Sequence, residues 1–298
     1  MTAREHLPTE RGSERSAELD RLSLEDALRV FDQEDRRCAE AVEERRPEIA
    51  RAIELVTERL RAGGRLLYVG AGTSGRLGVL DAVECPPTFQ SDPEQVQGRI
   101  AGGLDALLRS VEGAEDSAAA GRECVADAGE QDVVFGIAAG GTTPFVHGAL
   151  AEARARGAAT VFLACVPRED VPDEADVSIR LATGPEVLAG STRLKAGTAT
   201  KMVLNRVTTL AMARLGKVHG NLMVDVNTGG NSKLKARGEA MLRELCMLTA
   251  TEAAHLLERA AGRVKVACVM HRFGCDANEA ARRLERAGGF LREALGEG

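Results

Sequence analysis

The fold is decided by the stretch RLLYVGAGTSGRLGVLDAVECPPTF, residues 65–89. Its apolar run Leu66–Val69 is typical of a strand that is buried in a parallel sheet. The glycine-rich segment Gly70–Arg76 follows, and then an apolar pattern at helical or turn spacing. Between a strand and a helix, such a segment presents free backbone N–H groups at the positive end of the helix, where phosphate binds. We therefore predict a phosphate-binding turn here.

The same turn matches the dinucleotide fingerprint G-x-G-x-x-G from Gly70 onward, which alone is a weak signal. That fingerprint needs an acidic residue at the end of the second strand to bind a ribose. The next strand-like run ends instead in Gly102-Gly103. The side chains of Thr73, Ser74 and Arg76 are good donors to a phosphomonoester. The residues therefore favour a sugar phosphate over NAD, and a structural turn without a ligand remains the alternative.

Composition limits the classes of function. With 298 residues, 44% of them hydrophobic and 28% charged, the chain has the make-up of a soluble globular protein. Its net charge of −6 gives no electrostatic case for binding nucleic acid or membrane, and 3% aromatic residues give few platforms for base stacking. The sequence has neither a run of about 18 apolar residues nor the apolar segment of a secretory signal. We predict a cytoplasmic protein that binds no nucleic acid and no membrane.

The cysteines and histidines suggest no metal or nucleophile chemistry. Seven scattered cysteines, an odd number, indicate free buried thiols in a reducing compartment. Cys268, His271 and Cys275 could share one helix face, but a fourth ligand at a zinc-site spacing is missing. We expect a buried helix face there, with no metal. The remaining histidines are isolated and form no Ser-His-Asp arrangement, so we expect them to be structural.

The alternation of strand and helix continues along the chain. After the first strand, further strands are predicted at residues 97–101, 132–139, 159–165 and 177–181. Short apolar strands that alternate with helices predict an α/β fold, with a parallel sheet flanked by helices on both faces. Ligands of such sheets bind beyond the carboxyl ends of the strands. Both glycine-rich turns, the first one and a second at Gly140–Pro144, are expected at that edge.

The segments around the sheet complete the predicted organisation. Residues 1–20 are polar and predict a flexible arm, residues 21–230 the α/β domain with its N-terminal helices, and residues 231–298 a small helical region. Pro47 predicts a break or kink between helical stretches. A long helix is predicted to open at Ser191, and its first turn carries hydrogen-bond donors. These donors are Ser191, Thr192, Arg193 and Lys195.

Two carboxylates differ in their setting from the charged residues of helix surfaces. Glu84 and Glu115 each lie at a break in the pattern near a glycine-rich element, not on a repeating polar face. Their positions make them candidates for proton transfer, beside the alternative of ordinary solvated charges.

Five segments closely resemble the bacterial N-acetylmuramic acid 6-phosphate etherases. They are LLYVGAGTSGRLGVLDAVECPPTF, SVEGAEDS, DVVFGIAAGGTTPF, GSTRLKAGTATKMVLN and GKVHGNLMVDV. The resemblance extends from about residue 15 to the C-terminal helices. It implies a sugar-isomerase (SIS) type fold, a homodimer with its site near the subunit boundary, and no metal or organic cofactor.

The resemblance also implies a reaction, the cleavage of the D-lactyl ether of N-acetylmuramic acid 6-phosphate to N-acetylglucosamine 6-phosphate and D-lactate. In the open-chain sugar, the C1 aldehyde acidifies the C2 proton, so a base can remove it. The lactate oxygen on C3 then leaves with help from an acid, and water adds to the unsaturated aldehyde. Each proton transfer needs a positioned group, worth roughly 10²–10⁴-fold in rate.

The family's functional residues are carried over by position. Glu84 in VECPPT matches the proton donor, and Glu115 in EGAED matches the second acid/base residue. The resemblance implies that two glycine turns bind the phosphate and that the segment Ser191–Lys195 closes over the sugar. The residues expected to bind substrate are Gly72, Thr73, Ser74, Arg76, Gly141, Thr142, Thr143, Ser191, Thr192, Arg193 and Lys195.

One residue departs from the family pattern. The second turn usually reads Ala-Ser-Gly, and Gly140 stands where that serine is expected, which removes one hydroxyl donor. Two other classes therefore stay open at this point. One is an SIS-type isomerase acting on another sugar phosphate, against which the VECPPT and EGAED pair argues. The other is a non-enzymatic sugar-phosphate sensor, as in the related glucokinase regulatory protein.

Overall fold

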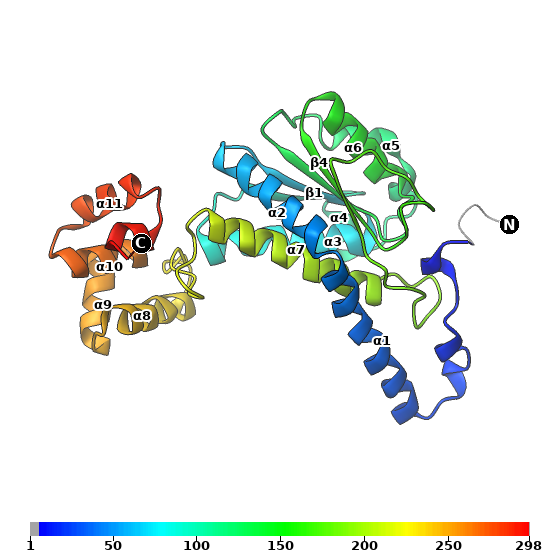
Figure 1. Ribbon diagram of the computed structural model, residues 1–298, viewed down its shortest axis with the longest axis horizontal. Helices are drawn as coiled ribbons and strands as arrows, with labels where there is room; N and C mark the ends of the chain where they lie inside the picture. The colour runs from blue at the N-terminus through cyan, green and yellow to red at the C-terminus, as the bar shows by residue number, and fades with distance from the viewer. Residues whose placement is uncertain (1–5, 298) are drawn as a thin grey trace. The chain divides into compact units, whose positions relative to one another are not determined.

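Five parallel strands form one sheet in the order β2-β1-β3-β4-β5 in the computed structural model, which describes residues 6–297 (Figure 1). The strands are β1 (Leu66–Gly70), β2 (Val96–Ile100), β3 (Val133–Ile137), β4 (Ala159–Ala164) and β5 (Val177–Arg180). Each predicted strand is present within a residue or two of its expected bounds. The parallel α/β fold predicted from the alternation is therefore confirmed.

Seven helices belong wholly or partly to the region of the sheet. They are α1 (Leu24–Glu44), α2 (Arg46–Arg61), α3 (Gly72–Phe89), α4 (Asp105–Leu108), α5 (Ala118–Glu123), α6 (Pro144–Ala155) and α7 (Lys195–Arg214). The first two are separated at Arg45, so the break expected from Pro47 falls just before that residue. Pro47 then lies in the first turn of α2, where its missing N–H group removes no helical hydrogen bond.

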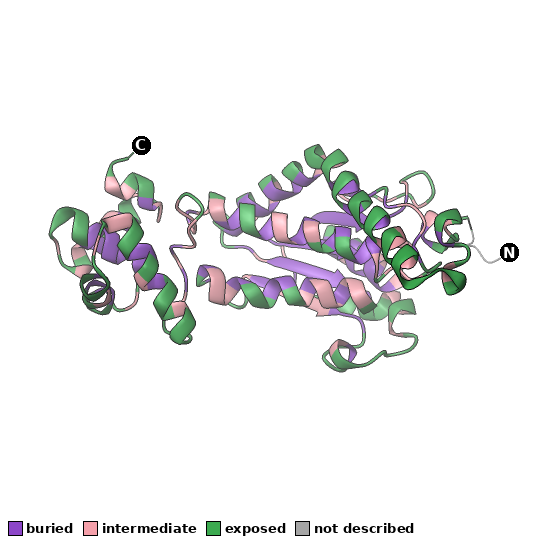
Figure 2. Cartoon of the chain, turned by 90° about the horizontal axis from the view of Figure 1, so that it is seen from below, coloured by how far each residue is buried: buried purple, intermediate pink, exposed green. Residues whose placement is uncertain are grey.

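The sheet is covered on both faces (Figure 1). Helices α5 and α6 lie on one face, and side chains such as Leu67, Phe162 and Val146 form a buried apolar cluster there. On the other face, Tyr68 donates a hydrogen bond to Asp81 of α3 at 3.0 Å, and Asn205 of α7 donates to the same carboxylate at 2.7 Å. Figure 2 shows the strands buried between helices whose outward faces are exposed.

The chain divides into two compact units. The sheet unit comprises Met1–Ala82 and Glu94–Thr208, and the helical unit comprises Val83–Pro93 and Thr209–Gly298. The helical unit contains α8 (Ser232–Cys246), α9 (Ala250–Arg259), α10 (Val264–Phe273), α11 (Ala277–Arg286) and α12 (Leu291–Leu295) around its own apolar core. The domain division at residue 230 stays a prediction from the sequence. The compact units have their boundaries within α3, after Pro93 and within α7.

The segment expected to be a flexible arm contains ordered residues. Residues 1–5 lie outside the described part of the chain. From His6 onward the segment forms three 3₁₀ turns, η1 (Pro8–Glu10), η2 (Glu14–Ser16) and η3 (Leu19–Arg21). Leu7 is 1% exposed and packs into the apolar cluster under α6. Burial of this side chain helps to fix the segment to the sheet unit, which its polar composition did not reveal.

Between residues 6 and 297, no helix combines the length and the apolar character that crossing a bilayer requires.

A salt bridge joins the starts of β1 and β3. The carboxylate of Asp132 accepts hydrogen bonds from the backbone N–H of Arg65 at 2.8 Å and from its guanidinium at 2.7 Å. Burial alone would raise the pKa of Asp132, but the hydrogen bonds from Arg65 and from the backbone of Gly129 hold it below its usual value. Such a carboxylate stabilises the fold above the pKa of the unfolded chain, and the contribution is lost as the pH falls through the folded pKa.

We predict that Asp132→Asn lowers the free energy of unfolding at pH 7 by about 1–3 kcal/mol, because hydrogen bonds to a charged group are lost. The difference from the parent protein should shrink below about pH 4, where the unfolded aspartate is protonated. Denaturant unfolding at pH 7 and pH 3 measures both effects. The exposed Asp170→Asn is the control. An equal deficit for Asp132→Asn at the two pH values would contradict the assignment.

Candidate functional site

The first glycine-rich turn joins β1 to α3 with very little space. A Cβ atom at Gly75 would lie 2.6 Å from the carbonyl oxygen of Gly70 and 2.6 Å from the Ile100 side chain, so the start of α3 is pressed against the ends of β1 and β2. Gly72 begins the helix with a φ of +52°, a conformation that favours glycine. Thr73 and Ser74 thus lie in the first turn of α3, half-buried, beyond the carboxyl ends of the strands.

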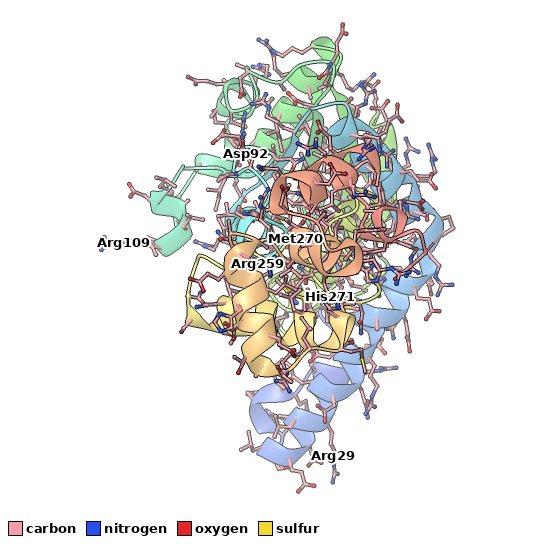
Figure 3. All side chains as sticks on the ribbon, turned by 90° about the vertical axis from the view of Figure 1, so that its left-hand side faces the viewer. Arg29, Asp92, Arg109, Arg259, Met270 and His271 are labelled. Atoms are coloured by element: carbon pink, nitrogen blue, oxygen red, sulfur yellow. The ribbon has the colours of Figure 1, made fainter. Side chains whose placement is uncertain are left out.

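Arg76 also holds the backbone of a neighbouring segment, a contact that the sequence did not reveal. Its Nε donates to the carbonyl of Leu107 at 3.3 Å, and its Nη2 donates to the carbonyl of Arg109 at 3.1 Å. The guanidinium therefore holds the loop that follows β2. Arg109 itself projects outward from the end of α4 (Figure 3). Whether Arg76 also contacts substrate stays a prediction.

A cavity of about 180 Å³ connects this turn with Glu115. Gly72 and Arg76 line one side, and Glu112 and Glu115 from the loop before α5 line the other. Glu115 lies in the 3₁₀ turn η4 (Ala114–Asp116) and is exposed. The structure thus brings one of the two candidate carboxylates to the first glycine turn.

Close packing of α5 on α6 determines where η4 lies. A Cβ at Gly121 would be 1.9 Å from the carbonyl oxygen of Phe145, and a Cβ at Gly148 would be 2.1 Å from that of Ala118. The two helices can approach this closely only because both positions are glycine. Since η4 directly precedes α5, the glycine contact also positions Glu115 relative to the start of α6.

The second glycine turn leads into the start of α6. Gly141 has a φ of +75° and is buried, and its carbonyl oxygen lies 2.6 Å from Nε2 of His147. His147 therefore stabilises the turn, in line with the structural role expected for the histidines. The N-cap residue Thr143 makes no side-chain hydrogen bond to the helix. Thr142 and Thr143 are both half-buried at this helix N-terminus.

The helix expected to open at Ser191 begins at Lys195 instead. The carboxylate of Glu186 accepts hydrogen bonds from the backbone N–H groups of Lys195 and Ala196, both at 2.9 Å, and so caps α7. Burial raises the pKa of Glu186, although these N–H groups act in the opposite direction. Sequence reasoning missed Glu186, because it lies well before the helix and outside any capping pattern.

Lys195, predicted to bind substrate, is buried in this structure, and its contact with substrate stays a prediction. It is 1% exposed, and its Nζ forms an ion pair with Glu34 of α1. Arg15 contacts the other oxygen of Glu34 at 3.2 Å. Burial would raise the pKa of Glu34, but Lys195 and Arg15 hold it below its usual value. Lys195 therefore joins α7 to α1 in this structure.

The other donors of the segment Ser191–Lys195 lie nearer than Lys195 to the first glycine-rich turn. Ser191 and Thr192 are half-buried, and Arg193 is exposed. A Cβ at Gly197 would lie 3.4 Å from the methyl group of Thr73 and 3.5 Å from the carbonyl oxygen of Thr192. The start of α7 thus lies beside the start of α3.

Glu84 lies on α3, which continues through Pro86 and Pro87, and its side chain is exposed. It belongs to the helical unit, whereas Glu115 belongs to the sheet unit. The convergence of the two carboxylates stays a prediction.

The cysteines lie in both units of the chain. Cys38, Cys85, Cys165 and Cys268 are buried, and the other three are half-buried. Within residues 6–297, no three His, Cys, Asp or Glu side chains are grouped as a metal ion would require.

Comparisons with known proteins identify relatives of the chain. The family described as glucokinase regulatory protein N-terminal SIS domain matches residues 48–154, and the SIS domain family matches residues 110–210. A protein of Synechocystis sp. named N-acetylmuramic acid 6-phosphate etherase is 55% identical over 297 residues, and one of the same name from Gloeobacter violaceus is 57% identical over 297 residues. Each comparison covers 99% of this chain and 97% of the relative.

A solved structure supports the fold. A Bacteroides fragilis protein, described as a candidate phosphosugar isomerase involved in capsule formation, matches with a TM-score of 0.52 and 18% identity. The match covers 71% of this chain and 99% of the other. At that identity the likeness shows the SIS-type fold alone.

We predict that Lys195→Met destabilises the fold strongly and that Arg193→Met hardly changes its stability. Lys195→Met leaves the buried carboxylate of Glu34 with Arg15 as its ion-pair partner, and we expect a loss of about 3 kcal/mol in the free energy of unfolding. Arg193→Met removes an exposed charge and should change it by less than about 0.5 kcal/mol. Denaturant unfolding measures both. The double variant Glu34→Leu/Lys195→Met should recover part of the loss; equal stability of the two single variants would contradict the ion-pair role.

Proposed function

The chain belongs to the N-acetylmuramic acid 6-phosphate etherase family, and we propose that it carries out that reaction with its own Glu84 and Glu115. It is a carbon–oxygen lyase that cleaves the D-lactyl ether of N-acetylmuramic acid 6-phosphate, a step in cell-wall amino sugar recycling. The identity of 55% and 57% to relatives of that name over almost the whole chain carries this conclusion. The same relatives do not favour an isomerase or a sensor.

Two helix N-termini would bind the 6-phosphate. Thr73 and Ser74 at the start of α3 and Thr142 and Thr143 at the start of α6 offer hydroxyl groups beside backbone N–H groups. Such an arrangement binds a dianion through aligned dipoles and hydrogen bonds. Gly72 and Gly141 let the backbone turn at these two points, and Ser191 and Thr192 complete the set of hydroxyls nearby.

The reaction then needs an acid and a base at the other end of the sugar. A base takes the C2 proton, and the electron pair is delocalised into the C1 aldehyde. The C3–O bond breaks, the lactate oxygen receives a proton from an acid, and water adds at C3 while C2 is reprotonated. Glu115 is suited to one of these roles because it lines the same cavity as the first turn. Glu84 supplies the other, as the resemblance of VECPPT implies.

The remaining properties follow from the family resemblance. We propose that the protein is a cytoplasmic homodimer with its site near the subunit boundary. The resemblance also implies that the reaction uses no metal or organic cofactor. Light scattering in solution tests the dimer.

We predict that Glu84→Gln and Glu115→Gln each abolish D-lactate release from N-acetylmuramic acid 6-phosphate and still bind N-acetylglucosamine 6-phosphate. Each amide keeps the size of the side chain and removes its capacity for proton transfer, so the loss should reach roughly 10²–10⁴-fold or more. An enzymatic assay of D-lactate and calorimetric titration of the product measure the two properties. Retained turnover in either variant would remove that residue from the mechanism.

A neighbouring carboxylate provides the control. Glu112 lines the same cavity, and Glu112→Gln should retain activity. In D₂O, a variant that exchanges the C2 proton without releasing lactate has lost the acid, and a variant that does neither has lost the base.

A further inference from the structure

The N-terminal segment, residues 6–16, reaches the carboxyl edge of the sheet. Leu7 is buried in the apolar cluster that also contains Ala138 and Val166, which follow β3 and β4. Glu10 donates its backbone N–H to the carbonyl of Leu7 at 3.0 Å, so the chain turns immediately after this anchor. The turn brings Thr9 between two loops of the predicted phosphate site.

Thr9 is held by its backbone and not by its side chain. Its carbonyl oxygen accepts a hydrogen bond from the N–H of Gly190 at 3.2 Å, in the loop that leads to α7. The residue is 0% exposed. Its Oγ1 has no hydrogen-bond partner among the described residues 6–297. A buried hydroxyl without a partner is destabilising, so the position calls for a polar group that completes it.

The neighbour of this hydroxyl is the second glycine turn. A Cβ at Gly140 would lie 3.7 Å from Thr9 Oγ1, with no other heavy atom within 4 Å apart from its chain neighbours. Gly140 itself offers no side chain. The turn therefore receives a hydroxyl from the N-terminal segment at the point where its own sequence provides none, one residue before Gly141 and close to Thr142.

We propose that Thr9 is a substrate-binding residue, whose hydroxyl donates a hydrogen bond to the phosphomonoester bound at the second glycine turn. The inference rests on the proposed function for the identity of the ligand, a sugar 6-phosphate. A phosphate oxygen beside Gly140 supplies the acceptor that Thr9 Oγ1 lacks. The hydroxyl is shielded from solvent in the free chain, so a phosphate oxygen reaches it only when the N-terminal segment shifts. The N-terminal segment is thus one wall of the site.

The test compares Thr9→Val, which keeps the shape and removes the hydroxyl, with Thr9→Ser, which keeps the hydroxyl. For Thr9→Val we expect the KM for N-acetylmuramic acid 6-phosphate and the Kd for N-acetylglucosamine 6-phosphate to rise roughly tenfold, as for one lost hydrogen bond to a charged group. The kcat should change much less. Thr9→Ser should stay close to the parent. Unphosphorylated N-acetylglucosamine should bind all three proteins with equal, weak affinity.

Two further variants sharpen the comparison. Thr57→Val is the matched control, since its buried hydroxyl donates to the carbonyl of Ile53 within α2 and should leave the Kd unchanged. Adding Gly140→Ser to Thr9→Val places a new hydroxyl at the same point and should restore much of the affinity. If Thr9→Val does not fold, Thr9→Ala takes its place in each measurement, because it lacks the same hydroxyl.

The outcomes separate this inference from the proposed function. If the parent releases D-lactate and Thr9→Val binds the product unchanged, Thr9 is only a buried structural residue and the inference is overturned. If the parent releases no D-lactate but Thr9→Val still weakens binding of N-acetylglucosamine 6-phosphate, the proposed reaction fails and the role of Thr9 stands. A parent protein that does not bind the sugar phosphate at all overturns both.

Discussion

The contact between the end of β1 and the start of α3 is the constraint on which the rest of the site depends. Gly70 and Gly75 touch through their backbones, so no side chain can be added at either position without displacing the helix. This contact directs the N–H groups of the first turn of α3 beyond the carboxyl edge of the sheet. A second helix start, that of α6, is brought to the same edge by β3, the neighbour of β1. Two positive helix ends at one edge favour a dianion.

The charged residues near this edge serve the fold more than the ligand. Arg76 is held by two backbone carbonyls, and Lys195 is buried against Glu34. The negative charge of Glu186 sits at the N-terminus of α7, where it would compete with an anionic ligand for the same N–H groups. We therefore propose that binding of phosphate depends on hydroxyl groups and on the backbone of α3 and α6. Neutral donors of this kind give directional hydrogen bonds without the long-range attraction that free cations provide.

The sequence was informative where the signal is local. The strands follow from short apolar runs, and the glycine turns follow from residue type alone, so both were predicted close to their observed positions. The start of α7 was missed because Lys195 is held by Glu34, 161 residues away in the chain, and by the cap from Glu186. Thr9 was missed for the same reason, since only the folded chain places it beside Gly140. Pairings across such separations leave no periodic pattern to read.

The assembly of the site from distant segments has a consequence for its energetics. The hydroxyls of the two glycine turns, Glu115 and Thr9 belong to four stretches of chain that meet only when the sheet unit is folded. A ligand at free concentration L that contacts several of them stabilises the folded unit by RT ln(1 + L/Kd), because the unfolded chain cannot bind it. Bound ligand stabilises the N-terminal segment most, since the buried hydroxyl of Thr9 lacks a hydrogen-bond partner until an acceptor binds. Leu7 keeps the segment in place without ligand, and the acceptor then completes the polar contact that apolar burial alone cannot supply.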